Sequence, residues 1–269
     1  MKQYVLKNLS AFGMIALCGL NAQASVSPFL GPIIGGTDVA ANDPIAQVSV
    51  AIYNNAESGL CTGSIIDTDL VVTAAHCAGA KASDLFVILD RDVNHMVDTD
   101  VVTVIGQVVN PGYDPASMTK DAHDIALLRI KGTFPIGYHA AKRLPLNTTF
   151  TKGEEVILAG YGISKAQATD PSGATAGVLR KTAGVFVDDP AFAKSEILLD
   201  QTQGHGACHG DSGGPAYVKA ANGDLLLWGV TNRGYPDDAP DDCVHGAVYT
   251  NINMYNQWLT ESAKTLHAL

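Results

Sequence analysis

Apolar residues fall in short blocks along most of the chain rather than in long helical repeats. The blocks are rich in Val, Ile and Leu and are bounded by Gly, Pro, Asn and Asp, a pattern that favours β-strands joined by turns. Many short strands of this kind indicate an all-β barrel or sandwich. The strands that we expect are Val48–Tyr53, Ser64–Thr73, Leu85–Leu89, Val101–Val109, Ile125–Ile130, Glu155–Ala159, Gly184–Val187, Glu196–Leu199, Leu225–Thr231 and Ala247–Asn251.

The C-terminal segment has a different pattern. Its apolar residues recur at the spacing of one face of an α-helix, at Ile252, Tyr255, Trp258, Leu259 and Leu266. We therefore expect a C-terminal helix over about 252–266 that packs on the body of the protein.

The first residues have the pattern of a secretory signal. Lys2 and Lys7 precede an apolar stretch, Leu9–Leu20, and Ala22-Gln23-Ala24 provides a small-x-small cleavage site. The apolar stretch is short for a membrane span. Cys18 raises the alternative of a lipoprotein, but the bulky Leu17 before it disfavours that processing. We expect a signal peptide at 1–24 and a secreted mature protein, extracellular or periplasmic, that is not held in a membrane.

Charge narrows the choice of partners. The 269-residue chain has 17 Lys and Arg against 27 Asp and Glu, a net charge of −10. Residues 1–32 contain two of the lysines and no acid, so without them the charge is 15 − 27 = −12. Such acidity disfavours nucleic acid and anionic membranes as partners.

Three short motifs contain the residues of an activated-hydroxyl nucleophile. They are Thr73-Ala74-Ala75-His76-Cys77, His123-Asp124 before an apolar run, and Gly210-Asp211-Ser212-Gly213-Gly214-Pro215. In such a set the serine attacks a carbonyl, the histidine takes its proton, and the carboxylate fixes the ring's tautomer. Asp124 leads directly into apolar residues, where a carboxylate needs a partner. We read the other histidines, including His123, as incidental.

In these motifs the sequence resembles the chymotrypsin-like (trypsin-like) serine proteases, over about residues 33–266. Further matches are Ile33-Ile34-Gly35-Gly36, Gln47-Val48-Ser49, Gly160-Tyr161-Gly162 and Val248-Tyr249-Thr250. The resemblance implies two six-stranded antiparallel β-barrels packed face to face, with a C-terminal α-helix. The protease domain would span 33–269, with barrel 1 at about 33–140 and barrel 2 at about 141–250. His76 and Asp124 would come from the first barrel and Ser212 from the second, with the active site in the cleft between them.

The resemblance also assigns roles around the serine. The backbone N–H groups of Gly210 and Ser212 would form the oxyanion hole. Asp211 would bind the α-amino group that cleavage creates on Ile33, after removal of a short propeptide at 25–32. The residue before Ile33 is Pro32 rather than Arg or Lys. We therefore expect an activating protease that is not trypsin-like.

The resemblance also implies the position of a substrate pocket. Its floor would be Gly206, where trypsin-like enzymes have aspartate, and its walls Gly234 and Ala247. This set favours apolar side chains before the scissile bond. Asn232 stands where the family commonly has a serine that bonds the catalytic aspartate, so its amide is expected to donate to Asp124.

Two further features bear on specificity. Arg233 replaces an aromatic residue, and we consider two roles: selection of acidic or polar substrate residues, or a solvated arginine paired with nearby acids. A run of acids, Asp237, Asp238, Asp241 and Asp242, precedes Cys243. This loop 237–242 could attract basic substrates or bind calcium weakly, although a solvated acidic loop is the simpler interpretation.

Four cysteines follow the leader, and four cysteines allow three pairings. They are Cys61, Cys77, Cys208 and Cys243. The resemblance implies the pairs Cys61–Cys77 and Cys208–Cys243. An export signal with an even number of cysteines fits an oxidising compartment.

Together these features predict a secreted serine endopeptidase that acts on a protein or peptide substrate through an acyl-enzyme intermediate. We expect no cofactor and no metal, and a monomer by default. Two alternatives stay open: a non-catalytic binding protein on a protease scaffold, and an esterase with the same triad.

Overall fold

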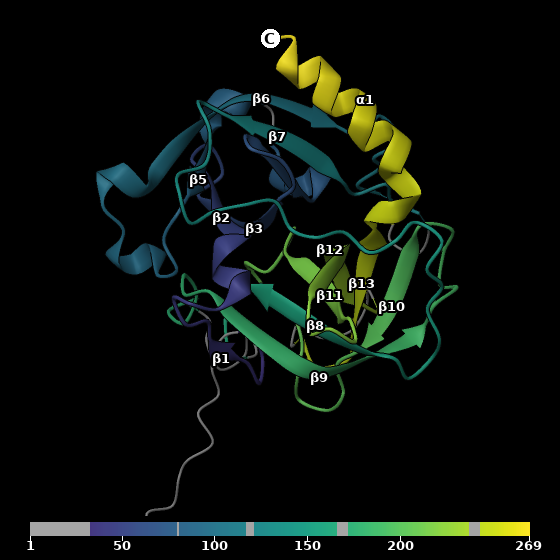
Figure 1. Ribbon diagram of the computed structural model, residues 1–269. Helices are drawn as coiled ribbons and strands as arrows, with labels where there is room; N and C mark the ends of the chain where they lie inside the picture. Colours follow the sequence, from purple (N-terminus) through teal and green to yellow (C-terminus); the bar gives the residue numbers. More distant parts are fainter. Residues whose placement is uncertain (1–32, 80, 117–120, 166–171, 237–242) are drawn as a thin grey trace, which may run out of the picture.

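The computed structural model describes residues 33–79, 81–116, 121–165, 172–236 and 243–269. The expected signal peptide at 1–24, the propeptide at 25–32 and the acidic loop 237–242 lie outside the described residues. The chain folds into two antiparallel β-barrels packed against each other, with a helix at the C-terminus (Figure 1).

The first barrel is built from six strands and closes on itself in the order β2-β3-β4-β7-β6-β5. Its interior is apolar, with Val50, Ile52, Val71 and Leu128 fully buried. The strands are β2 (Ser49–Asn54), β3 (Gly59–Ile65), β4 (Leu70–Thr73), β5 (Leu85–Ile88), β6 (Val101–Val109) and β7 (Ala126–Ile130).

The second barrel has the order β9-β10-β13-β12-β11-β8, and pairing of β8 with β9 closes it. A short first strand, β1 (Thr37–Asp38), adds to the outer edge of β9. Trp228 and Tyr249 are the largest side chains of this barrel's core. The strands are β8 (Glu155–Gly160), β9 (Arg180–Asp189), β10 (Glu196–Asp200), β11 (Pro215–Lys219), β12 (Leu225–Tyr235) and β13 (Gly246–Asn251).

The C-terminal segment leaves the second barrel and crosses to the first. A 3-10 turn, η6 (Ile252–Tyr255), leads into α1 (Asn256–His267), which lies along β6 and β7 (Figure 1). Leu266 is fully buried there, and Arg129 of β7 donates a hydrogen bond to its carbonyl at 2.8 Å. Within the described residues, no helix is both long and apolar enough to cross a membrane. The remaining 3-10 turns are η1 (Pro44–Gln47), η2 (Ala75–Cys77), η3 (Ala82–Asp84), η4 (Val93–His95) and η5 (Asp98–Asp100).

The fold class expected from the sequence is confirmed, with local differences. The expected strand Ser64–Thr73 is interrupted by a turn, because Ile66 donates to the carbonyl of Leu70 and Asp67 accepts from Thr68. The sequence gives no sign of β1 or β11. Each is too short for an alternating apolar pattern to be recognised. In addition, β11 begins directly after residues 210–214, the glycine-rich segment that contains Ser212 and is called the serine loop below.

Both disulfides that the resemblance implied are present. Cys61 of β3 is bonded to Cys77 of η2, and Cys208 is bonded to Cys243. The first bond attaches the turn that contains His76 to the wall of the first barrel. The second bond joins the segment before Ser212 to the segment that follows β12.

Candidate active site

His76 and Asp124 form a closely bonded pair in the first barrel. His76 lies in η2, after β4, and Asp124 lies just before β7, the neighbour of β4. The Nδ1 atom of His76 is 2.7 Å from Oδ2 of Asp124, and the backbone N–H of His76 donates to Oδ1 at 3.0 Å. The imidazole is 34% exposed and the carboxylate 2% exposed. The arrangement fixes the orientation of the ring, with its Nδ1 atom bonded to the carboxylate.

The serine loop of the second barrel packs against the same part of the first barrel. Gly213 has a φ of +78°, and a Cβ on it would lie 2.0 Å from Oγ1 of Thr73 and 2.9 Å from the nitrogen of Ala74. Only glycine permits both the backbone conformation and this close approach. Since Thr73 and Ala74 immediately precede the His76 turn, the contact brings Ser212 beside that turn. The carbonyl oxygen of Ser212 lies 3.6 Å from Sγ of Cys77.

Thr62 of β3 fixes the serine loop from the first barrel. Its hydroxyl donates to the carbonyl of Gly210 at 2.9 Å, and its backbone N–H donates to the carbonyl of Ser212 at 2.8 Å. Thr62 thus holds both carbonyls. Separately, the N–H groups of Gly210 and Ser212 have no hydrogen-bond acceptor among the described residues. They are therefore available to an oxygen atom that carries developing charge.

The imidazole of His76 is subject to opposing effects. Burial favours the neutral ring, but the hydrogen bond and the charge of Asp124, with a smaller effect of Glu57, outweigh it. The pKa of His76 is consequently raised above its ordinary value. A ring of this kind accepts a proton readily and can return it, as general acid–base chemistry requires.

Asp211 has a fully buried carboxylate next to the serine. Its oxygens accept from the backbone N–H groups of Gly162 and Cys208, both at 2.8 Å. A Cβ at Gly160 would lie 2.2 Å from this carboxylate, which explains the glycine there. Burial raises the pKa of Asp211 to about 7, although the two backbone hydrogen bonds and the charge of Arg180 act in the opposite direction.

Ile33 and Ile34 lie in the second barrel close to the expected substrate pocket. The side chain of Ile33 is fully buried in the core of that barrel. Ile34 forms an isolated β-bridge with Gly206, whose N–H donates to the Ile34 carbonyl at 3.0 Å. The segment that would begin the mature chain is therefore attached to the expected pocket floor.

A residue that the sequence did not single out, Gln201, lies at that floor. A Cβ on Gly206 would be 2.2 Å from Cδ of Gln201, so the Gln201 amide occupies the space that a floor side chain would need. Its Oε1 accepts from the N–H of Ala207 at 2.6 Å, and its Nε2 donates to the carbonyls of Ala207 and Cys243 at 3.2 and 3.1 Å. The amide thus links the two sides of the pocket. The expected wall residues Gly234 and Ala247 are register partners on β12 and β13.

Comparison with known proteins agrees with this geometry. The model of the Trypsin family matches residues 33–259.

The chain belongs to the trypsin family.

Among curated relatives, this protease is 28% identical to the vitellin-degrading protease of Bombyx mori, over 93% of each chain. It is 29% identical to kallikrein-12 of Homo sapiens, over 93% of this chain and 96% of that protein. It is 25% identical to trypsin iota of Drosophila melanogaster, over 96% and 100%. The protease is therefore a serine-type endopeptidase, a hydrolase, and the fold and family inferred from its motifs are confirmed.

For β12 of the protease, one expectation is wrong and another holds only in part. The amide of Asn232 donates to Glu196 at 3.0 Å and to Thr250 at 3.3 Å, not to the Asp124 carboxylate. Arg233 forms two parallel hydrogen bonds of 3.0 Å with Glu196, and its side chain is only 10% exposed. Of the two roles considered, pairing with an acid holds, but the pair is buried and the acid lies on β10. Glu196 was read from the sequence only as a strand residue.

His123 has a structural contact in the protease. It has a φ of +51°, and its Nδ1 lies 2.8 Å from the hydroxyl of Tyr255. An unusual backbone conformation directly before Asp124 is therefore held in place by a side-chain partner.

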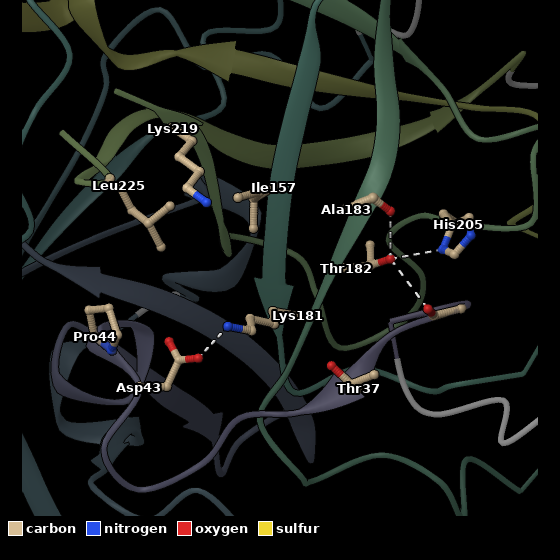
Figure 2. Close-up of a pocket in the computed structure, with 12 residues that line it drawn as sticks. Thr37, Asp43, Pro44, Ile157, Lys181, Thr182, Ala183, His205, Lys219 and Leu225 are labelled. Carbon is tan, nitrogen blue, oxygen red and sulfur yellow. Dashed lines mark hydrogen bonds and ion pairs between the residues drawn. The ribbon is translucent and has the colours of Figure 1, made fainter. Parts of the chain in front are cut away.

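The protease also has a cavity of about 490 Å³ on the outside of the second barrel, between β1, β8, β9 and the β11–β12 hairpin. Figure 2 shows Lys181 paired with Asp43, and Thr182 joined to Ala183 and His205. Since His76, Asp124 and Ser212 do not line it, this cavity is separate from the triad.

Proposed function

We propose that the protease cleaves peptide bonds through an acyl-enzyme in which Ser212 is the nucleophile. His76 removes the proton of the Ser212 hydroxyl as its oxygen bonds to the substrate carbonyl carbon, and then gives that proton to the leaving amine. A water molecule then attacks the acyl-enzyme, with His76 again taking and returning the proton. This step releases the carboxylic acid product and restores the Ser212 hydroxyl. The observation that carries the proposal is the 2.7 Å contact between His76 and the buried Asp124, beside a serine loop held by Thr62.

Stabilisation of the tetrahedral intermediate falls to the N–H groups of Gly210 and Ser212. Thr62 fixes the carbonyls of both residues, and this supports an oxyanion site that is already organised before substrate binds. Loss of one such donor in a protease costs on the order of 3 kcal/mol in the chemical step.

We infer a preference for neutral, apolar residues before the scissile bond. Gly206 supplies no carboxylate, and the Gln201 amide beside it already bonds to Ala207 and Cys243. A substrate Arg or Lys would enter this pocket without a counter-charge among the described residues, and desolvation of its cation would be unfavourable. Because Gln201 fills the space next to Gly206, it also limits the depth of the pocket.

Specificity is tested with peptides that differ only in the residue before the scissile bond. We expect Leu, Met and Phe peptides to be cleaved faster than Arg and Lys peptides, with no cleavage by Ser212→Ala. Gln201→Ala should move the preference toward larger side chains, whereas Gln203→Ala, an exposed neighbour, should not. Preferred cleavage after Arg or Lys would contradict the proposal and direct attention to the acidic loop 237–242.

Export and activation complete the proposal. The leader at 1–24 and the two disulfides support secretion into an oxidising compartment. The family match begins at residue 33, which supports Ile33 as the first residue of the mature enzyme. Cleavage after Pro32 would create an α-amino group to neutralise Asp211, and N-terminal sequencing of the active secreted protein tests this. Activity in a protein that still begins before Ile33 would contradict it.

A further inference from the structure

The segment that contains the catalytic aspartate is held at each residue by the second barrel. Asp121 accepts from Ser195 and Lys194, and the hydroxyl of Ser195 also contacts that of Tyr255 at 2.7 Å. Tyr255 in turn bonds His123. The backbone carbonyl of Asp124 accepts from the hydroxyl of Thr250 at 3.1 Å. Residues 121–124 belong to the loop before β7, so these contacts join the two barrels at the base of the triad.

Glu196 bonds Ala122, the remaining residue of this segment, and its side chain is fully buried. Its Oε1 accepts from the backbone N–H of Ala122 at 3.0 Å. The same carboxylate accepts from the Asn232 amide and, with both oxygens, from the Arg233 guanidinium. The side chain of Glu196 has no exposed surface. A single carboxylate therefore bonds both the aspartate segment and β12, the strand that contains the expected pocket wall Gly234.

Such an arrangement is costly unless every charge is matched. A buried carboxylate requires a partner and several hydrogen bonds, and the bidentate guanidinium of Arg233 with two N–H donors provides them. The ring of Phe192 adds a further contact, since Cζ of Arg233 lies 6.0 Å from its centroid. A packed apolar pair could fill this volume without that cost. Unlike an apolar pair, the carboxylate bonds both Arg233 of β12 and the backbone N–H of Ala122, so it fixes the position of the strand relative to the aspartate segment.

We propose that Glu196 is a positioning residue of the endopeptidase, which couples the substrate-binding strand β12 to the segment that holds Asp124 against His76. The proposal rests on the proposed function of the triad. Glu196 does not touch substrate; it acts through Ala122 on Asp124 and through Arg233 on the strand. Without it, Asp124 would be positioned less firmly and the hydrogen bond to His76 would lengthen for part of the time.

The test uses the secreted, processed protein and two kinds of variant. Glu196→Gln removes the negative charge that faces Arg233 but leaves an oxygen for Ala122. The double variant Glu196→Leu with Arg233→Met replaces the buried pair with apolar side chains, so the fold is expected to persist while Ala122 loses its acceptor. Glu261→Gln, the same chemical change on the exposed side of α1, is the matched control. Thermal unfolding shows whether each variant is folded. Titration with a serine-directed phosphonate counts the molecules whose Ser212 is reactive.

We expect kcat of the double variant, per titrated site, to fall on the order of tenfold to a hundredfold, because small displacements of catalytic groups have effects of this size. The acid limb of its kcat/KM profile should also move to lower pH, since a weaker contact with Asp124 lets the pKa of His76 fall. Asp124 contacts the ring and Glu57 acts on it at longer range, and neither is altered by the substitutions. Glu261→Gln should match the unaltered enzyme in both measurements.

Two results would overturn the proposal. One is a double variant that is folded and titrates fully but has unchanged kcat and an unchanged acid limb. The other is a loss confined to KM, which would reduce Glu196 to a support for β12 alone. Glu196→Gln distinguishes the two connections: we expect it to raise KM more than it lowers kcat, because the amide oxygen can still accept from Ala122 while the charge and the second acceptor that face Arg233 are lost. Failure of the unaltered enzyme to cleave any peptide would instead count against the proposed function.

Discussion

The imidazole of His76 is the group whose protonation should control activity. Asp124 raises its pKa against the effect of burial. The protonated ring cannot accept the serine proton, so activity should rise with pH as the ring loses its proton, through a midpoint above that of an ordinary histidine. We expect this rising limb in the kcat/KM profile of a Leu or Phe peptide.

Replacement of Asp124 by Asn should change that profile in a defined way. The pKa of His76 should fall, so the rising limb moves to lower pH, while kcat drops by roughly 10⁴-fold because the ring loses its fixed tautomer. Asp92→Asn is a matched control, since Asp92 forms a contact of the same 2.7 Å length with the exposed His95. A limb that stays in place in Asp124→Asn would show that another group controls it.

Sequence reasoning found the triad residues but not Gln201 or Glu196. His76 and Ser212 stand in motifs whose neighbours identify them, and Asp124 is marked by the apolar run that follows. Gln201 and Glu196 have no such motif. Their roles depend on long-range contacts, with Gly206 in one case and with Ala122 and Arg233 in the other, and register between distant strands cannot be read from one sequence. The same limit explains the wrong expectation for Asn232.

At the scale of elements, the C-terminal helix α1 is the part most directly predicted by periodicity. Apolar spacing indicated a helix over 252–266, and the structure divides that span into η6 and α1. The division follows from Asn251, whose side chain accepts from the N–H of Asn253 and starts a tight turn. Strand positions were also largely predicted from the apolar pattern. The two closed barrels were expected only from the family resemblance, because pairing of β8 with β9 has no signature in either segment.

Docking of α1 on the first barrel depends on Leu266. This residue is fully buried, and a Cβ on Gly106 of β6 would lie 2.9 Å from its Cδ2. We expect Leu266→Ala to reduce the free energy of unfolding by about 2–5 kcal/mol, because it leaves a cavity between α1 and β6. Denaturant unfolding of an inactive Ser212→Ala background measures this without autolysis. An effect no larger than that of the exposed Glu261→Gln would mean that the helix contributes little to stability.

At the scale of the whole molecule, Asp211 should make the uncut and processed forms respond differently to pH. In the uncut chain Ile33 has an amide nitrogen, and burial raises the pKa of Asp211 from 3.8 to about 7. Between these values the folded state holds a proton that the unfolded state has released. The stability of the uncut form should therefore fall as pH rises from about 4 to about 7.

Thermal unfolding of uncut Ser212→Ala across this pH range tests the effect. Asp211→Asn in the same background resembles the protonated acid and should have a flatter profile. Processed Ser212→Ala that begins at Ile33 should keep its stability over the same range, because a charged α-amino group would pair with the carboxylate. Equal profiles for the uncut and processed forms would argue against a contact between Ile33 and Asp211.

The crossing of α1 from the second barrel to the first has a consequence for the order in which the enzyme is made. Residues of the first barrel leave the ribosome before Ser212. Leu266 and His267, which attach the helix to Arg129 and Asp69, leave it after Ser212. A chain that stops before Leu266 still contains His76, Asp124 and Ser212 and the direct contacts between the barrels, but it lacks the attachment of α1 to Arg129. Premature translation products should therefore be less stable than the finished protease, because the contact between the last turn of α1 and the first barrel forms after all the others.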